Sequence, residues 1–132
     1  MTELFDDVIL GGTATREGLV GELQAQGLPL NSFSVQYEAF RVVKSGAGWL
    51  FGFSGYNSNS SAQFVQVFDA TVLPADGAVP VFVMTAPGAS NFSVAWNLPG
   101  RSFTQGILLC NSSTGPTKTI GSADCWFDCQ YA

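Results

Sequence analysis

The sequence predicts an all-β protein: an antiparallel β-sandwich or jelly-roll-like barrel of about seven strands, preceded by an N-terminal arm. From about residue 31 onward, apolar and polar residues alternate in short runs, as they do in strands with one buried face. Connectors rich in Pro, Gly, Asn, Asp and Ser separate these runs at roughly ten-residue intervals, which is typical of sandwiches and barrels. With 46% hydrophobic residues and 11 Phe, the chain can build a core without disulfides.

Residues 1–30 differ in character and are predicted to form the arm. Thr15 is a suitable helix N-cap, and Leu19 and Leu23 are spaced one helical turn apart. Two glycines in the same window would each cost up to ~1 kcal/mol in a helix interior. We therefore expect at most a short helix in the arm, followed by a β-sandwich domain over residues 31–132.

Seven strands are expected in that domain. Two of them, 79–86 and 102–111, are apolar on both faces, so we expect each to lie at the centre of a sheet or against another chain. The predicted strands cover residues 34–43, 49–56, 62–70, 79–86, 91–96, 102–111 and 123–131.

The charge distribution points to protein partners. Charged residues make up 11% of the chain, about half the usual share, and from Ser45 to the end only six occur. A surface this neutral favours a subunit whose faces are covered by partners, although a neutral domain that stays soluble alone is the alternative. Nucleic acid is not expected as a partner, because the five Lys and Arg residues form no cluster that would neutralise phosphates.

Targeting signals are not apparent in the sequence. The N-terminal stretch MTELFDDVILGG carries acids where a secretory signal needs Lys or Arg, so we expect a protein made in a cytosol. No run approaches the ~18–20 apolar residues of a membrane span, and no membrane partner is expected. Three Asn-x-Ser sequons are attributed to chance in a chain rich in Ser and Asn.

The three cysteines, Cys110, Cys125 and Cys129, are the first candidates for chemistry. A zinc site needs four ligands, and the chain has three thiols and no histidine. On a strand, Cys125 and Cys129 share a face with Phe127 and lie about 13 Å apart, too far for a disulfide. We therefore expect free cysteines packed as small apolar side chains, with no metal bound.

Other catalytic arrangements are also missing. A serine or threonine nucleophile needs a base, and the chain has no histidine. The acids outside the N-terminal segment are scattered, and the glycine-rich stretches lack the lysine of a phosphate-binding loop. The sequence thus predicts a protein that is not an enzyme, with no catalytic, cofactor-binding or metal-binding residues.

Residues 49–131 contain several distinctive motifs. They are QFVQV at 63–67, LPADG at 73–77, GRSF at 100–103 with Gly106 and Ile107, and SADCWF at 122–127. With these motifs, residues 49–131 resemble a small β-rich virion protein that recurs in tailed bacteriophages. The resemblance implies a capsid cement or decoration protein that binds between subunits of the major capsid protein, typically as a homotrimer, in virions assembled in the host bacterial cytoplasm.

Two functions of different kinds remain open from the sequence. One is a structural subunit that clamps capsid neighbours through its neutral body and acidic arm. The other is a tail or baseplate component, or a receptor- or glycan-binding module, which would use exposed aromatic side chains such as Trp49, Tyr56 or Trp96. Burial in the core is the competing interpretation for each of these aromatics.

Overall fold

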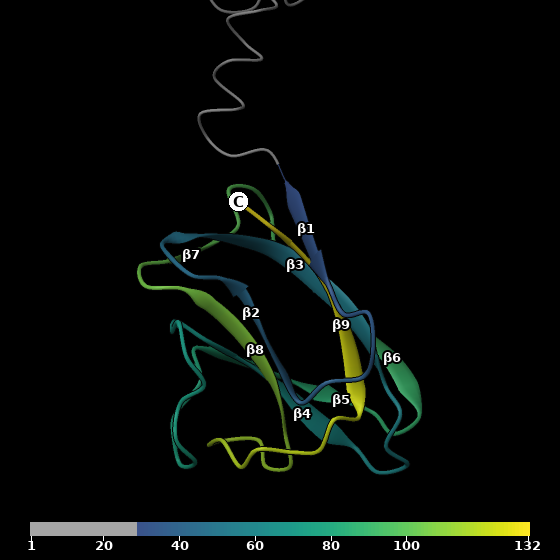
Figure 1. The fold of residues 1–132 in the computed structure, drawn as a ribbon. Helices are drawn as coiled ribbons and strands as arrows, with labels where there is room; N and C mark the ends of the chain where they lie inside the picture. The colour runs from purple at the N-terminus through teal and green to yellow at the C-terminus, as the bar shows by residue number, and fades with distance from the viewer. Residues whose placement is uncertain (1–28) are drawn as a thin grey trace, which may run out of the picture. The chain divides into compact units, whose positions relative to one another are not determined.

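The computed structural model describes residues 29–132, and over this range it is an antiparallel β-sandwich of nine strands (Figure 1). The predicted all-β sandwich is confirmed. The strands are β1 (Leu30–Phe33), β2 (Phe40–Lys44), β3 (Gly48–Asn57), β4 (Gln63–Phe68), β5 (Phe82–Ala86), β6 (Ser90–Ala95), β7 (Arg101–Phe103), β8 (Ile107–Ser112) and β9 (Cys125–Tyr131).

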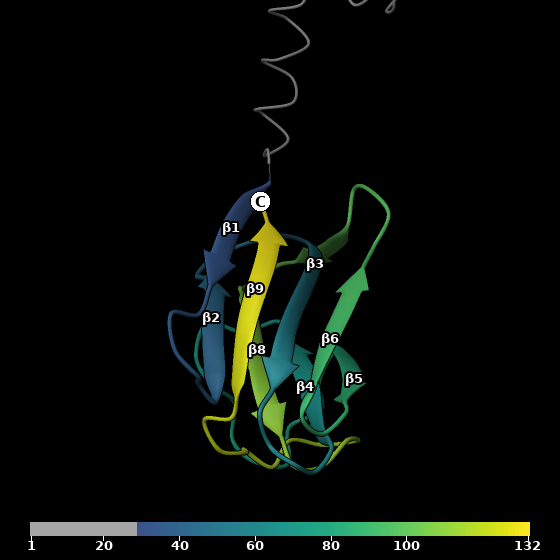
Figure 2. The same ribbon diagram turned by 90° about the vertical axis from the view of Figure 1, so that its right-hand side faces the viewer.

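Two sheets face each other. The first, sheet A, has the order β1-β9-β3-β6, and β7 pairs with the start of the long strand β3. The second, sheet B, has the order β2-β8-β4-β5. Figure 2 shows β1 and β2 along one side of the sandwich and β5 and β6 along the other. Each side therefore presents one edge strand from each sheet.

The main core lies between the sheets and depends on alternation along β3 and β9. Phe53 and Phe127 point inward and are 2% and 0% exposed. Gly55 is paired with Phe127 in the register, and a side chain at Gly55 would lie 2.5 Å from the Phe92 ring. Glycine at this position thus allows Phe92 to pack over β3 and reach Phe127, with ring centroids 6.1 Å apart.

A second, smaller cluster lies on the outer face of sheet B. Strand β8 is buried along its whole length: Ile107 and Leu109 join the main core, while Leu108 and Cys110 face outward. Loop residues including Leu73, Ala78 and Ile120 cover this outer side. The expectation that this two-sided apolar strand lies centrally is confirmed, because β8 sits between β2 and β4.

The other two-sided apolar run behaves differently. The expected strand 79–86 begins only at Phe82 and forms β5, which is an edge strand of sheet B. A central position is therefore wrong for this strand. Its other predicted environment, the surface of another chain, stays a prediction.

The strand count exceeds the expected seven because β1 was not expected and one expected strand is divided. The strand expected over residues 34–43 forms only from Phe40 onward, as β2, and β1 (Leu30–Phe33) lies before the expected strand. The two strands lie in different sheets, so the chain must leave sheet A and cross to sheet B between them. The regular alternation of residues 34–39 gives no sign of this crossing.

The divided strand is the one expected over residues 102–111, and Asp69 explains the division. Its carboxylate accepts hydrogen bonds from the backbone N–H groups of Thr104, Gln105 and Gly106, at 3.1, 2.8 and 3.2 Å. This turn carries the chain from β7 in sheet A to β8 in sheet B. A side chain at Gly106 would lie 2.5 Å from the Ala70 carbonyl oxygen, so glycine is needed where the turn passes this backbone.

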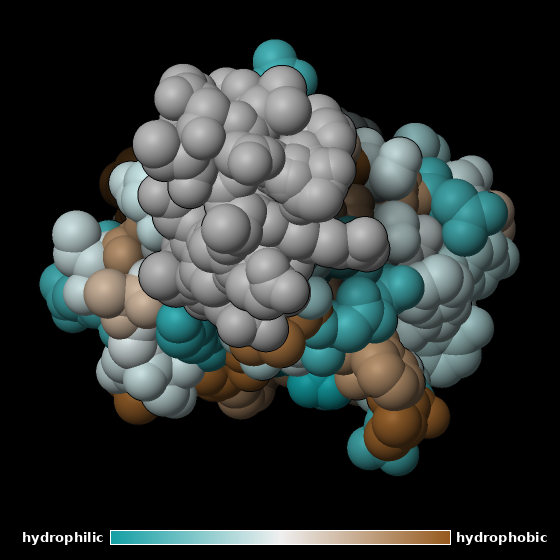
Figure 3. Space-filling model, turned by 90° about the horizontal axis from the view of Figure 1, so that it is seen from above, coloured by the Kyte–Doolittle hydropathy of each residue, from teal (hydrophilic) through white to brown (hydrophobic). Residues whose placement is uncertain are grey.

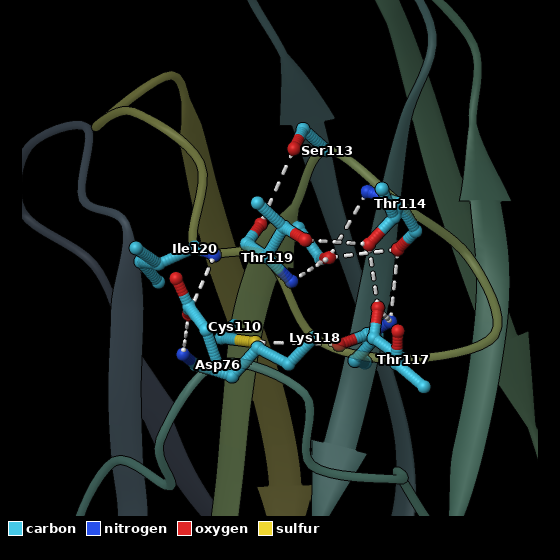
Figure 4. Close-up of polar contacts among 10 residues, drawn as sticks. Asp76, Cys110, Ser113, Thr114, Thr117, Lys118, Thr119 and Ile120 are labelled. Carbon is cyan, nitrogen blue, oxygen red and sulfur yellow. Dashed lines mark hydrogen bonds and ion pairs between the residues drawn. The ribbon is translucent and has the colours of Figure 1, made fainter.

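Polar side chains fix the loops over the outer face of sheet B. The Gln66 amide, fully buried on β4, donates to the carbonyl oxygens of Thr114, Gly115 and Thr117 at 2.8–3.1 Å. Figure 4 shows the same loop around Lys118, whose buried ammonium group contacts the Asp76 carboxylate. The hydrogen bond from Lys118 holds the pKa of Asp76 below its ordinary value. These contacts close one face of the sandwich.

The predicted arm and its short helix lie in residues 1–30, almost entirely outside the described residues. Leu30, the last of them, belongs to β1 and pairs with Tyr131. Among residues 29–132, no helix is long and apolar enough to cross a membrane.

Replacing Asp69 with Asn should destabilise the fold at neutral pH by about 1 kcal/mol, since the carboxylate accepts several hydrogen bonds but is partly exposed. Burial raises the pKa of Asp69, but the N–H groups of Gln105, Thr104 and Gly106 together with the Thr104 hydroxyl outweigh it and leave the pKa below 3.8. A lowered pKa contributes stability above the unfolded value and loses it as the pH falls through the folded value. The difference between wild type and Asp69→Asn should therefore shrink from pH 6 to pH 3.

Urea unfolding at the two pH values measures this difference. Thr104→Ala is the matched control, because it removes one donor and keeps the carboxylate, so most of the pH dependence should remain. A difference between wild type and Asp69→Asn that stays constant over this range would contradict the role given to the carboxylate.

Candidate interaction surfaces

The cysteines lie in the core and not at the surface. Cys125 and Cys129 point inward from β9 on either side of Phe127, as the alternation predicts, and Cys110 packs in the outer cluster of sheet B. All three are free and buried. Burial raises the pKa of each thiol to about 12, so the reactive thiolate is scarcely populated near neutral pH.

Metal-ligating side chains do not gather in the described part of the chain. Over residues 29–132, no three His, Cys, Asp or Glu side chains come close enough to hold a metal ion. Several of the polar contacts found there join side chains to backbone at turns and strand ends, and others join side chains to one another. The surfaces that remain to be considered are therefore the edges and the outer faces of the sheets.

The first surface, which we call the β5 patch, consists of Val79, Val81 and Val83. These side chains are 74%, 42% and 39% exposed. The alternate residues Phe82 and Met84 pack against the main core, so Val83 faces outward. The β5 patch thus forms an apolar row along an open sheet edge.

The second surface lies on the opposite side, where the chain passes from β1 to β2. The segment that we call the 34–38 loop is held against β9 at both of its ends. Ser34 donates its N–H to the Phe127 carbonyl oxygen at 2.8 Å, and Glu38 donates to that of Cys125 at 2.7 Å. Three loop residues, 35–37, therefore span the length that one residue, Trp126, occupies on β9.

The excess chain length makes a pocket. It has a volume of about 320 Å³ and is lined by Ser34, Val35, Gln36, Tyr37 and Trp126. Val35 is 87% exposed and Tyr37 is 47% exposed. The pocket opens on the outer side of sheet A, because Trp126 alternates with the inward-facing Cys125 and Phe127.

The outer face of sheet A beyond this pocket carries polar side chains along β9, and on β1 the exposed Phe33 lies opposite Asp128 in the register. Asn31 donates to the Asp128 carboxylate at 3.0 Å, and Gln130 donates to Asn31 at 3.0 Å and to Asp128 at 3.2 Å. Seen from the end of the sandwich in Figure 3, hydrophobic residues are scattered among hydrophilic ones around the rim of the molecule. Sheet A therefore offers hydrogen-bonding groups in a fixed arrangement beside aromatic rings.

A polar cluster closes the edge beneath the pocket. The Arg41 guanidinium pairs with the Glu38 carboxylate at 3.0 Å and donates to the Phe33 carbonyl oxygen. Glu38 also accepts from the Ser34 hydroxyl, which in turn accepts from the Phe127 N–H at 2.9 Å. These contacts hold both ends of the 34–38 loop and neutralise the charged groups beside it.

The three aromatics singled out from the sequence have different environments. Trp96 is half-buried and packs against the core, with its ring centroid 5.1 Å from that of Phe82. Trp49 is 37% exposed on β3. Tyr56 lies on the outer face of sheet A, directly opposite Trp126 in the register.

Sequence reasoning missed Trp126 and Tyr37 as candidates. The strand pattern did place Trp126 on the opposite face from the cysteines. Nothing in the alternation of residues 34–43 indicated that Tyr37 leaves the strand and stands opposite Trp126, because that depends on how the loop is anchored.

Comparison with known proteins does not identify a family for this chain. No protein-family model matches the chain, and neither does any curated protein. Among solved structures, the coat protein of Tobacco streak virus is similar at a TM-score of 0.38 and 13% identity, over 77% of this chain and 84% of that chain. A likeness this remote does not establish a family or a function.

We expect all three thiols to be inert in the native protein and reactive after unfolding, because burial suppresses the thiolate. Titration with dithiobis-nitrobenzoate at pH 8, without reductant, should show negligible reaction before and three groups after addition of denaturant. Fewer than three groups in denaturant, or stoichiometric zinc in the purified protein, would contradict this expectation.

Proposed function

We propose that the chain is a structural subunit of a virus particle, most specifically a capsid cement protein of a tailed phage that binds between major capsid subunits as a homotrimer. The resemblance of residues 49–131 to small phage virion proteins supports the class of protein. The composition supports binding to other protein subunits through neutral outer faces, because only six charged side chains occur after Ser45.

The exposure of the apolar β5 patch is the observation that most supports the proposal. Edge strands of monomeric proteins are usually protected by charged side chains, bulges or covering loops. Strand β5 itself carries no charged residue, and its exposed positions are Val83 and Thr85. Arg101 donates to the Val81 carbonyl oxygen just before the strand but leaves the Val83 side chain exposed. Pro80 and Pro87 flank it and limit its length, but they leave the valine row open. An apolar edge of this kind is suited to burial against another protein.

A tail or baseplate location is the second candidate for the particle. A tail component would bind its neighbours through the same neutral, apolar edge. The β5 patch therefore does not distinguish a tail position from a capsid position. Binding to different parts of the particle separates the two. The full chain should adhere to particles from which it has been removed, at the capsid for a cement protein and at the tail for a tail component.

Light scattering at micromolar concentration tests the oligomer. We expect about three times the 13.9 kDa of one chain. A stable monomer that does not adhere to stripped particles would remove both the oligomer and the cement function.

Introducing a charge into the β5 patch should weaken assembly without unfolding the domain. Val83→Lys places an ammonium group on the exposed side of an edge strand, where it is harmless in a monomer but must be desolvated in an interface. We expect a shift toward monomer by light scattering and at least a tenfold loss of particle binding. Ser93→Lys, which adds the same charge to the exposed face of β6, is the matched control and should assemble normally.

Deleting residues 1–29 should leave a folded β-domain that assembles less well. Residues Leu30–Tyr131 form a compact unit with its own core, so the truncated chain should keep its circular dichroism spectrum and cooperative unfolding. Binding to stripped particles should weaken, because the proposed arm is lost. An unfolded truncated chain would place the segment in the core instead, and unchanged binding would remove the arm from the interface.

A further inference from the structure

We propose that the pocket between the 34–38 loop and Trp126 binds a neutral carbohydrate, with one sugar ring against the aromatic side chains and its hydroxyl groups on the polar outer face of sheet A. This site is independent of the β5 patch and of the assembly proposed above. It lies on the β1–β2 side of the sandwich, whereas the β5 patch lies on the other side (Figure 2).

The pocket is held by the fold. Both ends of the 34–38 loop are hydrogen-bonded to β9, through Ser34 and Glu38, on either side of Trp126. The Arg41–Glu38 pair fixes the second of these ends. A ligand would therefore meet an open pocket that exists before binding, which lowers the entropy lost on association. Its 320 Å³ is at the small end of the range for ligand sites and suits one ring better than a large cofactor.

The lining presents aromatic surface to a ring. Tyr37 is 47% exposed and borders the pocket with the half-buried Trp126. Tyr56 stands opposite Trp126 on the neighbouring strand and continues the aromatic surface across sheet A. Pyranose rings carry a face of C–H groups that packs on aromatic rings, while their hydroxyl groups remain at the rim.

Polar groups for sugar hydroxyls continue along β9 beyond the pocket. Asp128 and Gln130 lie two and four residues from Trp126, where further units of an oligosaccharide would reach them. With Asn31 they form a chain of hydrogen bonds that orients their amide and carboxylate groups. Amides supply both donors and acceptors, and a carboxylate supplies acceptors only, which together match adjacent sugar hydroxyls. Exposed Gln36 adds another amide at the pocket itself.

Charge selects against anionic ligands. Residues 29–132 contain four bases. Arg41 lies beside the pocket, but its charge is paired with Glu38, and Lys118 is buried against Asp76. Lys44 lies at the far end of β2, paired with Ile107, and Arg101 donates to the Val81 carbonyl oxygen at the β5 patch. With Asp128 two residues along β9 from Trp126, phosphates and acidic sugars would meet repulsion, whereas a neutral sugar would not.

The test titrates the full chain with neutral tetrasaccharides, namely cellotetraose, maltotetraose and chitotetraose, and follows the three indole N–H signals by NMR. We expect saturable shifts of the Trp126 signal with at least one of them. Tyr37→Ala, in an exposed loop position, should weaken that binding roughly tenfold or more, since one stacking ring is lost. Trp126→Phe should retain part of the affinity, and Trp126→Ala should lose it.

Trp49→Ala is the matched control, because it removes an exposed tryptophan outside the pocket and should leave the affinity unchanged. Absence of saturable shifts for every sugar up to about 10 mM would overturn the proposal. Equal losses in Trp49→Ala and Tyr37→Ala would also overturn it. So would tighter binding of choline or of heparin than of any neutral sugar, since these would assign the pocket to a cation or to an anion.

Discussion

The pairing of β9 with β3 and β1 is the constraint on which the rest of the structure depends. The inward side chains of β9, Cys125, Phe127 and Cys129, form one side of the core, and close packing beside them requires glycine at position 55. Its outward side chains begin with Trp126 and continue into the hydrogen-bonded Asp128 and Gln130. The same backbone anchors the 34–38 loop. One strand thus positions the core and the pocket together.

The outer faces of the two sheets differ in polarity and in how much of them loops cover. Sheet B is apolar on both sides along β8, so loops must cover it, and buried polar groups such as Gln66 and Lys118 hold those loops in place. The cost of burying these groups is offset because each has a partner. Sheet A has polar outer positions on β6 and along β9 beyond Trp126, while the outer side of β1 includes the exposed Phe33. An open polar face therefore remains beside the loop-covered one.

This division leaves two surfaces with different chemistry on opposite sides of one small domain. The β5 patch is apolar and linear, and it belongs to the edge of a sheet, as expected for contact with another protein chain. The pocket combines aromatic rings with oriented amides and suits a small polar ligand. Their separation means that a subunit assembled through one surface would keep the other accessible.

The sequence by itself determined the fold class and the inward face of residues 125–129, because these follow from local alternation and from apolar runs that must be buried. Tertiary structure alone decided the strand division, the pocket, and which of the two apolar strands is central, β8, and which is an edge, β5. Asp69 and Ser34 act through hydrogen bonds to residues 35 or more positions away, and such contacts leave no periodic signal in the chain. The partner of Trp126 across the pocket, Tyr37, is 89 residues distant for the same physical reason.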